Sequence, residues 1–375
     1  MFKRVLLTAT VQSHICQFHR PLVQLLHDYG YEVHVAARNN LNEKNGLKLD
    51  FADKTFDVPF SRSPLDPKNL KAYHMLKRII DCGEYEVIHC NTPMGGIVTR
   101  LASVHTRRKG TKVFYTAHGF HFYKGAPLQN WLIYYPIEKA FALITDKLIT
   151  ITREDYERAK RRFKTDVYHI HGVGVDEKRY HPAANDDEKR SIRKKLGLPE
   201  NDILILNIGE LLPNKNQSMA IHMMKILLKE YPDSMLIIAG NGPEKENLMK
   251  LVKDLKITDK VRFIGYCPYL EEYQRAVDYV VSCSKREGLP LNIVEAMLSG
   301  NPVVATNNRG HKELIKNEIN GNLVDINDDK MMEIYLKELI KNSKKADLFR
   351  KYAKRRAAFY GLHAVTDELK KVYEV

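Results

Sequence analysis

The sequence predicts an α/β protein with two doubly wound parallel-sheet domains. Short apolar runs alternate with amphipathic stretches along the whole chain, which is typical of parallel strands joined by helices. This alternation restarts near residue 203, after a charged segment at 176–200 that contains Pro182 and Pro199. The chain has 375 residues, and a single hydrophobic core usually supports fewer residues than this. We therefore expect two domains rather than one.

The first domain is expected at residues 1–180. Its predicted strands are residues 4–9, 32–37, 85–90, 112–117 and 147–152. Its predicted helices are residues 19–29, 68–80, a helix that opens near 91–96, 128–144 and 153–164. The polar residues 10–14 and the Asn-, Asp- and Pro-rich segment 39–70 are predicted to be mostly loop.

The second domain is expected at residues 181–350, followed by a basic helical tail at 351–375 that returns to pack on the first domain. Its predicted strands are residues 203–208, 235–239, 261–264, 279–283 and 302–306. Its predicted helices are residues 216–230, 244–256, 270–276 and one that ends before Gly300. Strands again alternate with helices, so this sheet is also expected to be parallel.

Two carboxylates mark a candidate site in the second domain. Glu287 follows the strand at 279–283, and Glu295 lies in the helix that begins near Pro290 and ends before Gly300. The start of a helix offers unpaired N–H groups and a positive dipole end, which suit a phosphate. Ionised carboxylates accept hydrogen bonds, which suits the hydroxyls of a sugar or a ribose. Open α/β sheets bind ligands at the carboxyl ends of their strands, where this site lies.

Composition and charge restrict the partners. The chain carries a formal charge of +14, and residues 1–180 hold 28 Lys or Arg against 18 Asp or Glu, so an anionic partner is indicated: nucleic acid, phospholipid head groups or a phosphorylated substrate. The five cysteines lack metal-ligand spacing, which favours a reducing, cytoplasmic location. No apolar run approaches the ~20 residues of a membrane-spanning helix, so any membrane contact is expected to be peripheral.

Several motifs together resemble a known family. Glu287 and Glu295 form an E-x7-E pattern, the loop 209–216 resembles a donor-phosphate loop with Lys215 in the phosphate-binding position, and 240–243 resembles the turn Gly-Asn-Gly-Pro. The chain thus resembles the retaining glycosyltransferases of family 4. It is similar in particular to bacterial enzymes of exopolysaccharide and capsule synthesis, through the runs at 89–96, 115–127 and 134–140. The resemblance implies a GT-B fold, in which two Rossmann-like domains face each other across a cleft.

The resemblance also implies an activity and a set of donor-binding residues. The activity is transfer of a sugar from a nucleotide-diphosphate sugar, with UDP favoured, to a hydroxyl of a polyprenyl-diphosphate-linked saccharide. Glu287 is expected on the hydroxyls of the donor sugar, Glu295 on the ribose and Lys215 on the diphosphate. Further donor-binding residues are expected to be Gly209, Glu210, Arg286, Gly288 and Leu289. Glu210 stands where the family commonly has Arg, so Lys215 must carry more of the charge, with help from Arg286 or the helix start.

The first domain is expected to serve the acceptor. His118 follows the strand at 112–117 and is predicted to orient the donor sugar or the acceptor hydroxyl. The alternative is that His118 has no functional role and is a packed or solvent-facing histidine. Ser13 and His14, after the first strand, are predicted on the acceptor side. No Asp-x-Asp occurs, so no metal ligands or cofactor are predicted and activity is expected to be metal-independent.

Basic helices and an aromatic segment in the first domain predict contact with the inner leaflet of the cell membrane. The alternative is that the basic helices are ordinary solvent-exposed faces and that the aromatic side chains pack in the core. The expected location is therefore cytoplasmic, at the inner membrane face. A UDP-sugar epimerase of the same plan remains an alternative. A nucleic-acid-binding protein is another, but helix-turn-helix, RNP and zinc patterns are absent and no nucleic-acid partner is predicted. A further alternative is that the chain is a catalytically inactive partner subunit with the same fold, because Glu210 stands where the family commonly has Arg.

Overall fold

The computed structural model describes residues 3–43 and 47–375, which form two compact units. Unit 1 comprises Met1–Gly174 and Leu362–Val375, and unit 2 comprises Val175–Gly361. The sequence placed the first boundary at 180 and the tail at 351. The observed boundaries differ because Tyr180 and the segment up to Tyr360 are packed into the hydrophobic core of unit 2.

Unit 1 is built on a sheet of seven parallel strands. They are β1 (Lys3–Val11), β2 (Tyr31–Arg38), β3 (Lys54–Asp57), β4 (Val87–Asn91), β5 (Lys112–Ala117), β6 (Lys147–Thr150) and β7 (Asp166–His169). Its helices are α1 (Gln12–Phe18), α2 (Arg20–Asp28), η1 (Leu41–Glu43), α3 (Lys68–Gly83), α4 (Pro93–Ala102), α5 (Val104–Arg107), α6 (Leu128–Ala142), α7 (Arg153–Arg162) and α16 (Leu362–Tyr373). The strand order β3-β2-β1-β4-β5-β6-β7 confirms the predicted doubly wound arrangement.

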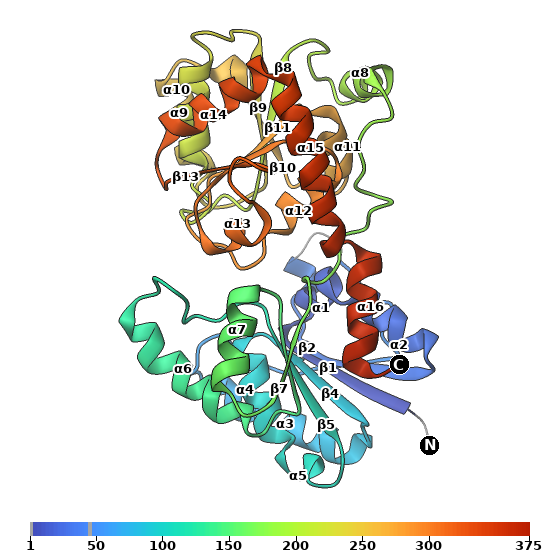
Figure 1. Cartoon of the computed structure of the whole chain (residues 1–375). Helices are drawn as coiled ribbons and strands as arrows, with labels where there is room; N and C mark the ends of the chain where they lie inside the picture. Colours follow the sequence, from blue (N-terminus) through green and yellow to red (C-terminus); the bar gives the residue numbers. More distant parts are fainter. Residues whose placement is uncertain (1–2, 44–46) are drawn as a thin grey trace. The chain divides into compact units, whose positions relative to one another are not determined.

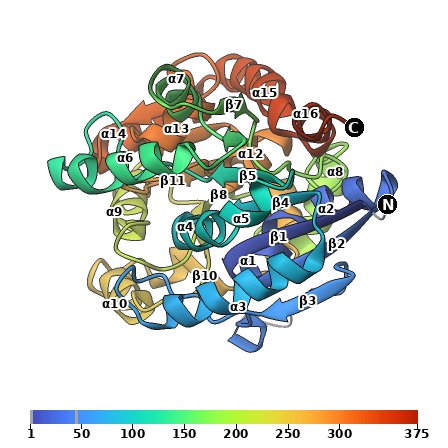
Figure 2. The same ribbon diagram turned by 90° about the horizontal axis from the view of Figure 1, so that it is seen from below.

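Helices cover both faces of this sheet. Ile88 of β4 packs with Leu76 of α3 and Val98 of α4, whereas the next residue, His89, is hydrogen-bonded through Nδ1 to the hydroxyl of Tyr373 in α16, at 2.7 Å. Successive side chains of a strand point to opposite faces. The helices α3, α4 and α5 therefore share one face (Figure 2), and α16 lies on the other face beside α2 (Figure 1).

Two parts of unit 1 differ from the sequence expectation. Residues 10–14 were expected as loop, but β1 continues to Val11 and α1 begins at Gln12. The strands β3 and β7 were not expected. Both lie at the edges of the sheet and keep most side chains partly exposed, so they lack the apolar run of a strand that is buried on both faces.

A buried ion pair attaches α6 to the rest of unit 1. Arg100 of α4 is 1% exposed, and its Nη2 lies 3.0 Å from Oε2 of Glu138. The hydroxyl of Tyr115 donates to the other carboxylate oxygen at 3.1 Å. Glu138 and Ala142 are the buried residues of α6. A helix that is apolar in sequence therefore buries a carboxylate and leaves leucines exposed, and in Figures 1 and 2 it extends past the sheet.

Unit 2 is built on a sheet of six parallel strands in the order β10-β9-β8-β11-β12-β13. They are β8 (Ile203–Ile208), β9 (Ser234–Ala239), β10 (Val261–Gly265), β11 (Tyr279–Ser282), β12 (Val303–Thr306) and β13 (Asn322–Val324). Its helices are α8 (Asp186–Lys195), α9 (Gln217–Leu227), α10 (Lys245–Asp254), η2 (Thr258–Lys260), α11 (Leu270–Ala276), α12 (Leu291–Leu298), α13 (Arg309–Leu314), α14 (Asp329–Lys341), α15 (Ser343–Ala357) and η3 (Ala358–Tyr360).

Local sequence explains where the central helix of unit 2 begins and ends. Pro290 is the N-cap of α12, where its missing N–H costs nothing, and Gly300 adopts φ +77° just beyond the last turn. The apolar face of α12 packs into the core with α15, as Figure 1 shows within this unit. In the described part of the chain, every helix is too short or too polar to cross a membrane.

Candidate active site

The loops that follow three neighbouring strands of unit 2 lie at one edge of its sheet. The strands β8, β11 and β12 are adjacent and parallel, so the segments after Ile208, Ser282 and Thr306 leave the sheet at the same, carboxyl edge. Open α/β sheets bind ligands at this edge. The first segment carries Lys215 and the second carries Glu287, as the sequence predicted.

The loop after β8 is held against the turn that follows β9. Gly240 has φ +141°, and a Cβ at this position would overlap the carbonyl oxygen of Gly209. A Cβ at Gly242 would overlap the carbonyl oxygen of Leu211. The N–H of Leu211 donates to the carbonyl oxygen of Asn241 at 2.9 Å. Only glycine allows two backbones to approach this closely, and this approach fixes the path of the loop.

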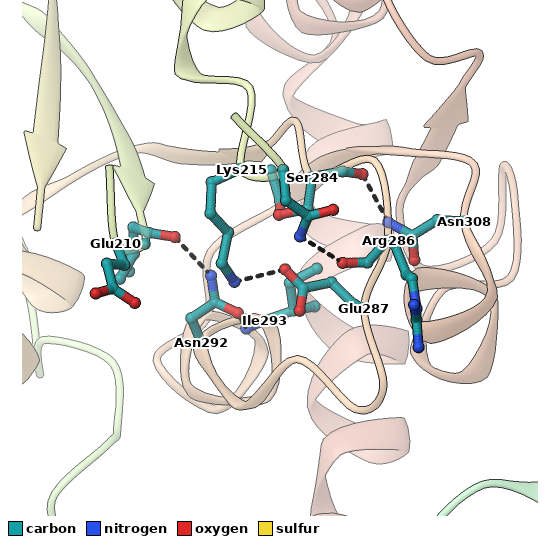
Figure 3. A network of polar contacts seen from close by, with 12 residues as sticks. Glu210, Lys215, Ser284, Arg286, Glu287, Asn292, Ile293 and Asn308 are labelled. Atoms are coloured by element: carbon teal, nitrogen blue, oxygen red, sulfur yellow. Dashed lines mark hydrogen bonds and ion pairs between the residues drawn. The ribbon is translucent and has the colours of Figure 1, made fainter. Parts of the chain in front are cut away.

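Lys215 and Glu287 form an ion pair at the centre of the site (Figure 3). Nζ of Lys215 lies 2.6 Å from Oε1 of Glu287, and the two side chains are 24% and 14% exposed. The aliphatic part of Lys215 packs over Gly209, where a Cβ would lie 3.2 Å from Cδ of the lysine. A cation and an acceptor-only carboxylate are therefore presented side by side. Such a pair can bind a diphosphate and the hydroxyls of a sugar.

Asparagine side chains hold the loop that carries Glu287. Nδ2 of Asn308 donates to the carbonyl oxygen of Ser284 at 2.8 Å. Nδ2 of Asn214 donates to the carbonyl oxygen of Arg286 at 2.9 Å. Both hydrogen bonds are drawn in Figure 3. These two asparagines position the loop, and neither was predicted from the sequence as a site residue.

The segment after β12 completes the support. A Cβ at Gly310 would overlap both the carbonyl oxygen of Gly288 and Cβ of Glu287. The next residue, His311, is fully buried, and this burial lowers its pKa to about 4. The sequence held a usable signal for these residues, because they follow the strand predicted at 302–306. The carboxyl end of that strand had to lie beside the Glu287 loop.

The start of α12 lies beside the Lys215 ammonium, as Figure 3 shows for Asn292 and Ile293. Nδ2 of Asn292 donates to the carbonyl oxygen of Ile208 at 3.0 Å, which ties the helix start to the end of β8. The first N–H groups of a helix have no intrahelical acceptor and form the positive end of its dipole. This end of α12 and Lys215 therefore act on the same space.

Glu295 lies one turn further along α12 and has different neighbours. Burial raises the pKa of Glu295 to about 7, and the charge of Glu271 adds to the rise. Arg179 and a hydrogen bond from the hydroxyl of Tyr180 oppose it. In residues 3–43 and 47–375, no hydrogen bond or ion pair joins Glu295 to Glu287. The structure thus brings Lys215 and Glu287 together and places Glu295 in a separate environment beside Arg179 and Tyr180.

The other expected donor-binding residues lie around the Lys215–Glu287 pair. Figure 3 shows the side chain of Arg286 directed away from the pair and the exposed Glu210 on the side of Lys215 opposite Glu287. Leu289 packs against the hydrophobic core of unit 2 and so anchors the loop. Lys215 is therefore the cation that lies next to Glu287 in this loop cluster.

At the carboxyl edge of the unit 1 sheet, two of the predicted residues meet. His118 follows β5 and His14 lies on α1; their Nε2 atoms are 3.3 Å apart, and Nε2 of His118 is 3.2 Å from Oδ1 of Asn91. Burial lowers the pKa of His118 to about 4, so the ring is neutral at pH 7. Ser13 is buried, and its hydroxyl accepts a hydrogen bond from Nδ2 of Asn40 at 2.9 Å. Ser13 therefore secures the loop after β2.

A pocket of about 410 Å³ lies at the opposite edge of unit 2, where β8 and β11 begin. Lys189 and Arg193 line it, and both pair with Asp278, which also lines it. The two cations share the one carboxylate of Asp278. None of the residues predicted for the donor or acceptor site lines this pocket.

Family comparisons cover both units. Residues 4–152 match the family described as glycosyl transferase 4-like, and residues 188–356 match the family described as glycosyl transferases group 1. EpsD of Bacillus subtilis (strain 168), a protein named as a glycosyltransferase, is 43% identical over 330 residues, which cover 88% of this chain and 85% of EpsD. The UDP-Gal:alpha-D-GlcNAc-diphosphoundecaprenol alpha-1,3-galactosyltransferase of Escherichia coli is 29% identical over 300 residues, which cover 77% of this chain and 76% of that enzyme.

Solved structures share the fold. The structure of Anabaena Alr3699/HepE in complex with UDP aligns with a TM-score of 0.76 at 19% identity. The alignment covers 100% of this chain and 100% of HepE. WaaG, a glycosyltransferase involved in lipopolysaccharide biosynthesis, has a TM-score of 0.74 at 15% identity and covers 98% of this chain and 99% of WaaG. At these identities the likeness shows the GT-B fold, which agrees with the fold that the sequence predicted.

Proposed function

The chain belongs to the glycosyltransferases, and we propose that it transfers a sugar from a UDP-sugar to a saccharide on a polyprenyl diphosphate, with retention of configuration. The glycosyltransferase matches favour transfer over the epimerase and nucleic-acid-binding alternatives. The observation that carries the donor assignment is the Lys215–Glu287 ion pair beside the start of α12. The proposed process is the assembly of extracellular or capsular polysaccharide.

The leaving group of this reaction is a nucleoside diphosphate, so the chief demand is stabilisation of developing negative charge. Lys215 supplies a cation, and the first N–H groups of α12 supply a dipole aimed at the same space. Glu287 holds the ammonium while the donor is absent. When the diphosphate binds, the Lys215 ammonium pairs with the phosphate oxygens in place of Glu287. The Glu287 carboxylate is then available to accept hydrogen bonds from the sugar. Solved structures of HepE with UDP and with UDP-glucose support the choice of UDP.

Substitution of the pair separates binding from turnover. Lys215→Met removes charge-assisted hydrogen bonds to the diphosphate, worth about 1.5–3 kcal/mol, so the Kd for UDP should rise about 10- to 150-fold in calorimetric titration. Lys285→Met, an exposed lysine in the neighbouring loop, is the matched control and should leave the Kd unchanged. Glu287→Gln should lower transfer about 100-fold while UDP binding is kept. Equal UDP affinity in Lys215→Met and the control would overturn the donor assignment.

The acceptor assignment is supported by the name of the Escherichia coli relative, which specifies a diphosphoundecaprenol acceptor, and by the surface of α6. Leu128, Leu132 and Ile133 of this helix are 72%, 67% and 54% exposed. The exposed basic residues of α7 add to the positive charge of unit 1. An exposed apolar surface on a positively charged unit suits an anionic lipid surface. We place the protein in the cytoplasm, peripherally at the inner membrane face.

Liposome flotation tests the membrane contact. The chain should float with vesicles that contain anionic lipid and remain free with neutral vesicles. Leu132→Glu should reduce the floated fraction, whereas Leu348→Glu, at a residue 51% exposed on α15 of unit 2, should not. Equal partition with and without anionic lipid would contradict the proposal.

A further inference from the structure

Three histidines gather at the carboxyl edge of the unit 1 sheet. His14 lies on α1, His19 lies between α1 and α2, and His118 follows β5. One ring nitrogen from each lies within 4.8 Å of the ligand atoms of the other two. The ring centroids are 4.7 Å apart for His14 and His118, 5.3 Å for His14 and His19, and 5.8 Å for His19 and His118. The sequence predicted site roles for His14 and His118 and none for His19.

The spacing of the first pair matches that of two ligands on one ion. Histidine nitrogens bind Zn²⁺ at about 2.0–2.1 Å in tetrahedral geometry, which places two such nitrogens about 3.3 Å apart. The Nε2 atoms of His14 and His118 are 3.3 Å apart. The same distance permits a weak hydrogen bond between two neutral rings, so the third histidine decides between the two interpretations.

Nε2 of His19 is buried without a hydrogen-bond partner in the described part of the chain. His19 as a whole is 4% exposed. His89, which is 1% exposed in the same unit, shows the normal case: Nδ1 is bonded to Tyr373 and Nε2 to Thr116, each at 2.7 Å. Buried polar atoms are almost always paired. An unpaired buried nitrogen on a histidine that lies in a cluster with His14 and His118 therefore favours a ligand that is not a protein group.

We propose that His14, His19 and His118 bind a late first-row divalent metal ion, with Zn²⁺ as the best fit. The donors are imidazoles without a carboxylate, and Arg62 acts on His14 as a neighbouring cation. Hard ions such as Mg²⁺ depend on oxygen ligands and negative charge, whereas imidazole suits Zn²⁺, Co²⁺, Ni²⁺ and Cu²⁺. Oδ1 of Asn91, which lies 3.2 Å from Nε2 of His118, or a water molecule is available for the fourth position.

This metal would oppose turnover rather than support it, an effect that rests on the proposed function and on the role predicted for His118 in orienting the donor sugar or the acceptor hydroxyl. The lone pair of Nε2 in His118 cannot bind a metal ion and also accept a hydrogen bond from a sugar hydroxyl. Zn²⁺ should therefore inhibit transfer, and a chelator should restore it. A transfer reaction that needs no metal and a site that binds an inhibitory metal are compatible.

Metal binding is tested without any assay of turnover. The untagged, metal-free chain is titrated with Co²⁺, whose visible absorption reports tetrahedral nitrogen ligands, and Zn²⁺ is then added as a competitor. The wild type should bind one Co²⁺ per chain and release it to Zn²⁺, with no response to Mg²⁺. His19→Asn and His14→Gln should weaken binding about tenfold or more. His105→Asn, at an exposed histidine of α5, is the matched control and should bind as the wild type does.

Circular dichroism of each variant verifies folding, and His14→Gln serves if His19→Asn does not fold, because His14 is only half-buried on its helix. The proposal is overturned if the wild type binds neither Co²⁺ nor Zn²⁺, or if both ligand variants bind as tightly as the control. Failure of UDP binding or transfer leaves these results unaffected, so the metal site and the proposed enzyme activity are tested separately.

Discussion

The buried carboxyl of Glu295 gives the chain a pH dependence that one substitution should remove. Burial raises the pKa of Glu295 to about 7, against 4.5 for an unburied glutamate. The folded protein therefore binds a proton more tightly than the unfolded chain. The stability contributed by this group is fully present below pH 4.5 and is lost as the pH rises through 7. At about 1.4 kcal/mol per pKa unit, the loss is about 3 kcal/mol.

Glu295→Gln keeps the shape of the side chain and cannot ionise. The free energy of unfolding of wild type minus variant should therefore fall by about 3 kcal/mol between pH 4.5 and pH 8, because other titrating groups cancel in the difference. Urea unfolding followed by circular dichroism measures it. Glu295 lies in unit 2, whereas the single tryptophan, Trp131, lies in unit 1. Fluorescence therefore reports the unfolding of unit 1 and allows it to be separated from the unfolding of unit 2. Glu246→Gln, at an exposed glutamate of α10, should show no such slope.

The same ionisation should affect the donor. If the Glu295 carboxylate accepts hydrogen bonds from the ribose, as the family resemblance implies, then protonation below pH 7 converts an acceptor into a donor. In the wild type, the Kd for UDP should rise as the pH falls below 7, with a slope that approaches tenfold per pH unit. In Glu295→Gln the Kd should not change with pH over this range. A pH-independent difference in unfolding between the two proteins would refute the reasoning, because it would mean that the carboxyl ionises in its ordinary range.

Three further outcomes are expected. Gly240→Ala should weaken UDP binding about tenfold in calorimetric titration, because the new Cβ overlaps the carbonyl oxygen of Gly209 and displaces the Lys215 loop; an unchanged Kd would show that the loop adapts. Arg100→Ala should destabilise unit 1 by about 3–5 kcal/mol in urea unfolding followed by Trp131 fluorescence, because it leaves the carboxylate of Glu138 buried without its cation. A loss below about 1 kcal/mol would mean that water reaches this carboxylate. Transfer by the metal-free chain should proceed at the same rate with and without EDTA, and loss of activity that Mg²⁺ or Mn²⁺ restores would contradict the expectation of metal independence.

Local pattern was enough to predict most of the two sheets. Strands buried on both faces are apolar along their length, so central strands such as β1, β4 and β8 were visible in the sequence. The edge strands β3 and β7 were not, because their partly exposed side chains lack this signal. The start of α1 was also missed, since the polar residues after β1 carry no helical pattern of apolar spacing.

The sequence by itself determined the type of each site residue and the strand that each one follows. Glu287 and His118 were identified because each follows an apolar run that was predicted to be a strand, and Lys215 was identified because its loop resembles a donor-phosphate loop. Only the tertiary structure decided which of these residues meet. Lys215 and Glu287 are 72 positions apart, and their ion pair exists because β8 and β11 are neighbours in the sheet.

The separate environment of Glu295, the support from Asn308 and Gly310, and the approach of His19 to His14 and His118 also arise from folding. Periodicity in a sequence reports the local direction of the chain and which face of an element is buried. Strand order is set by contacts between residues far apart in sequence. Burial of a carboxyl or an imidazole depends on that order, and so do the charges and pKa values on which the chemistry rests.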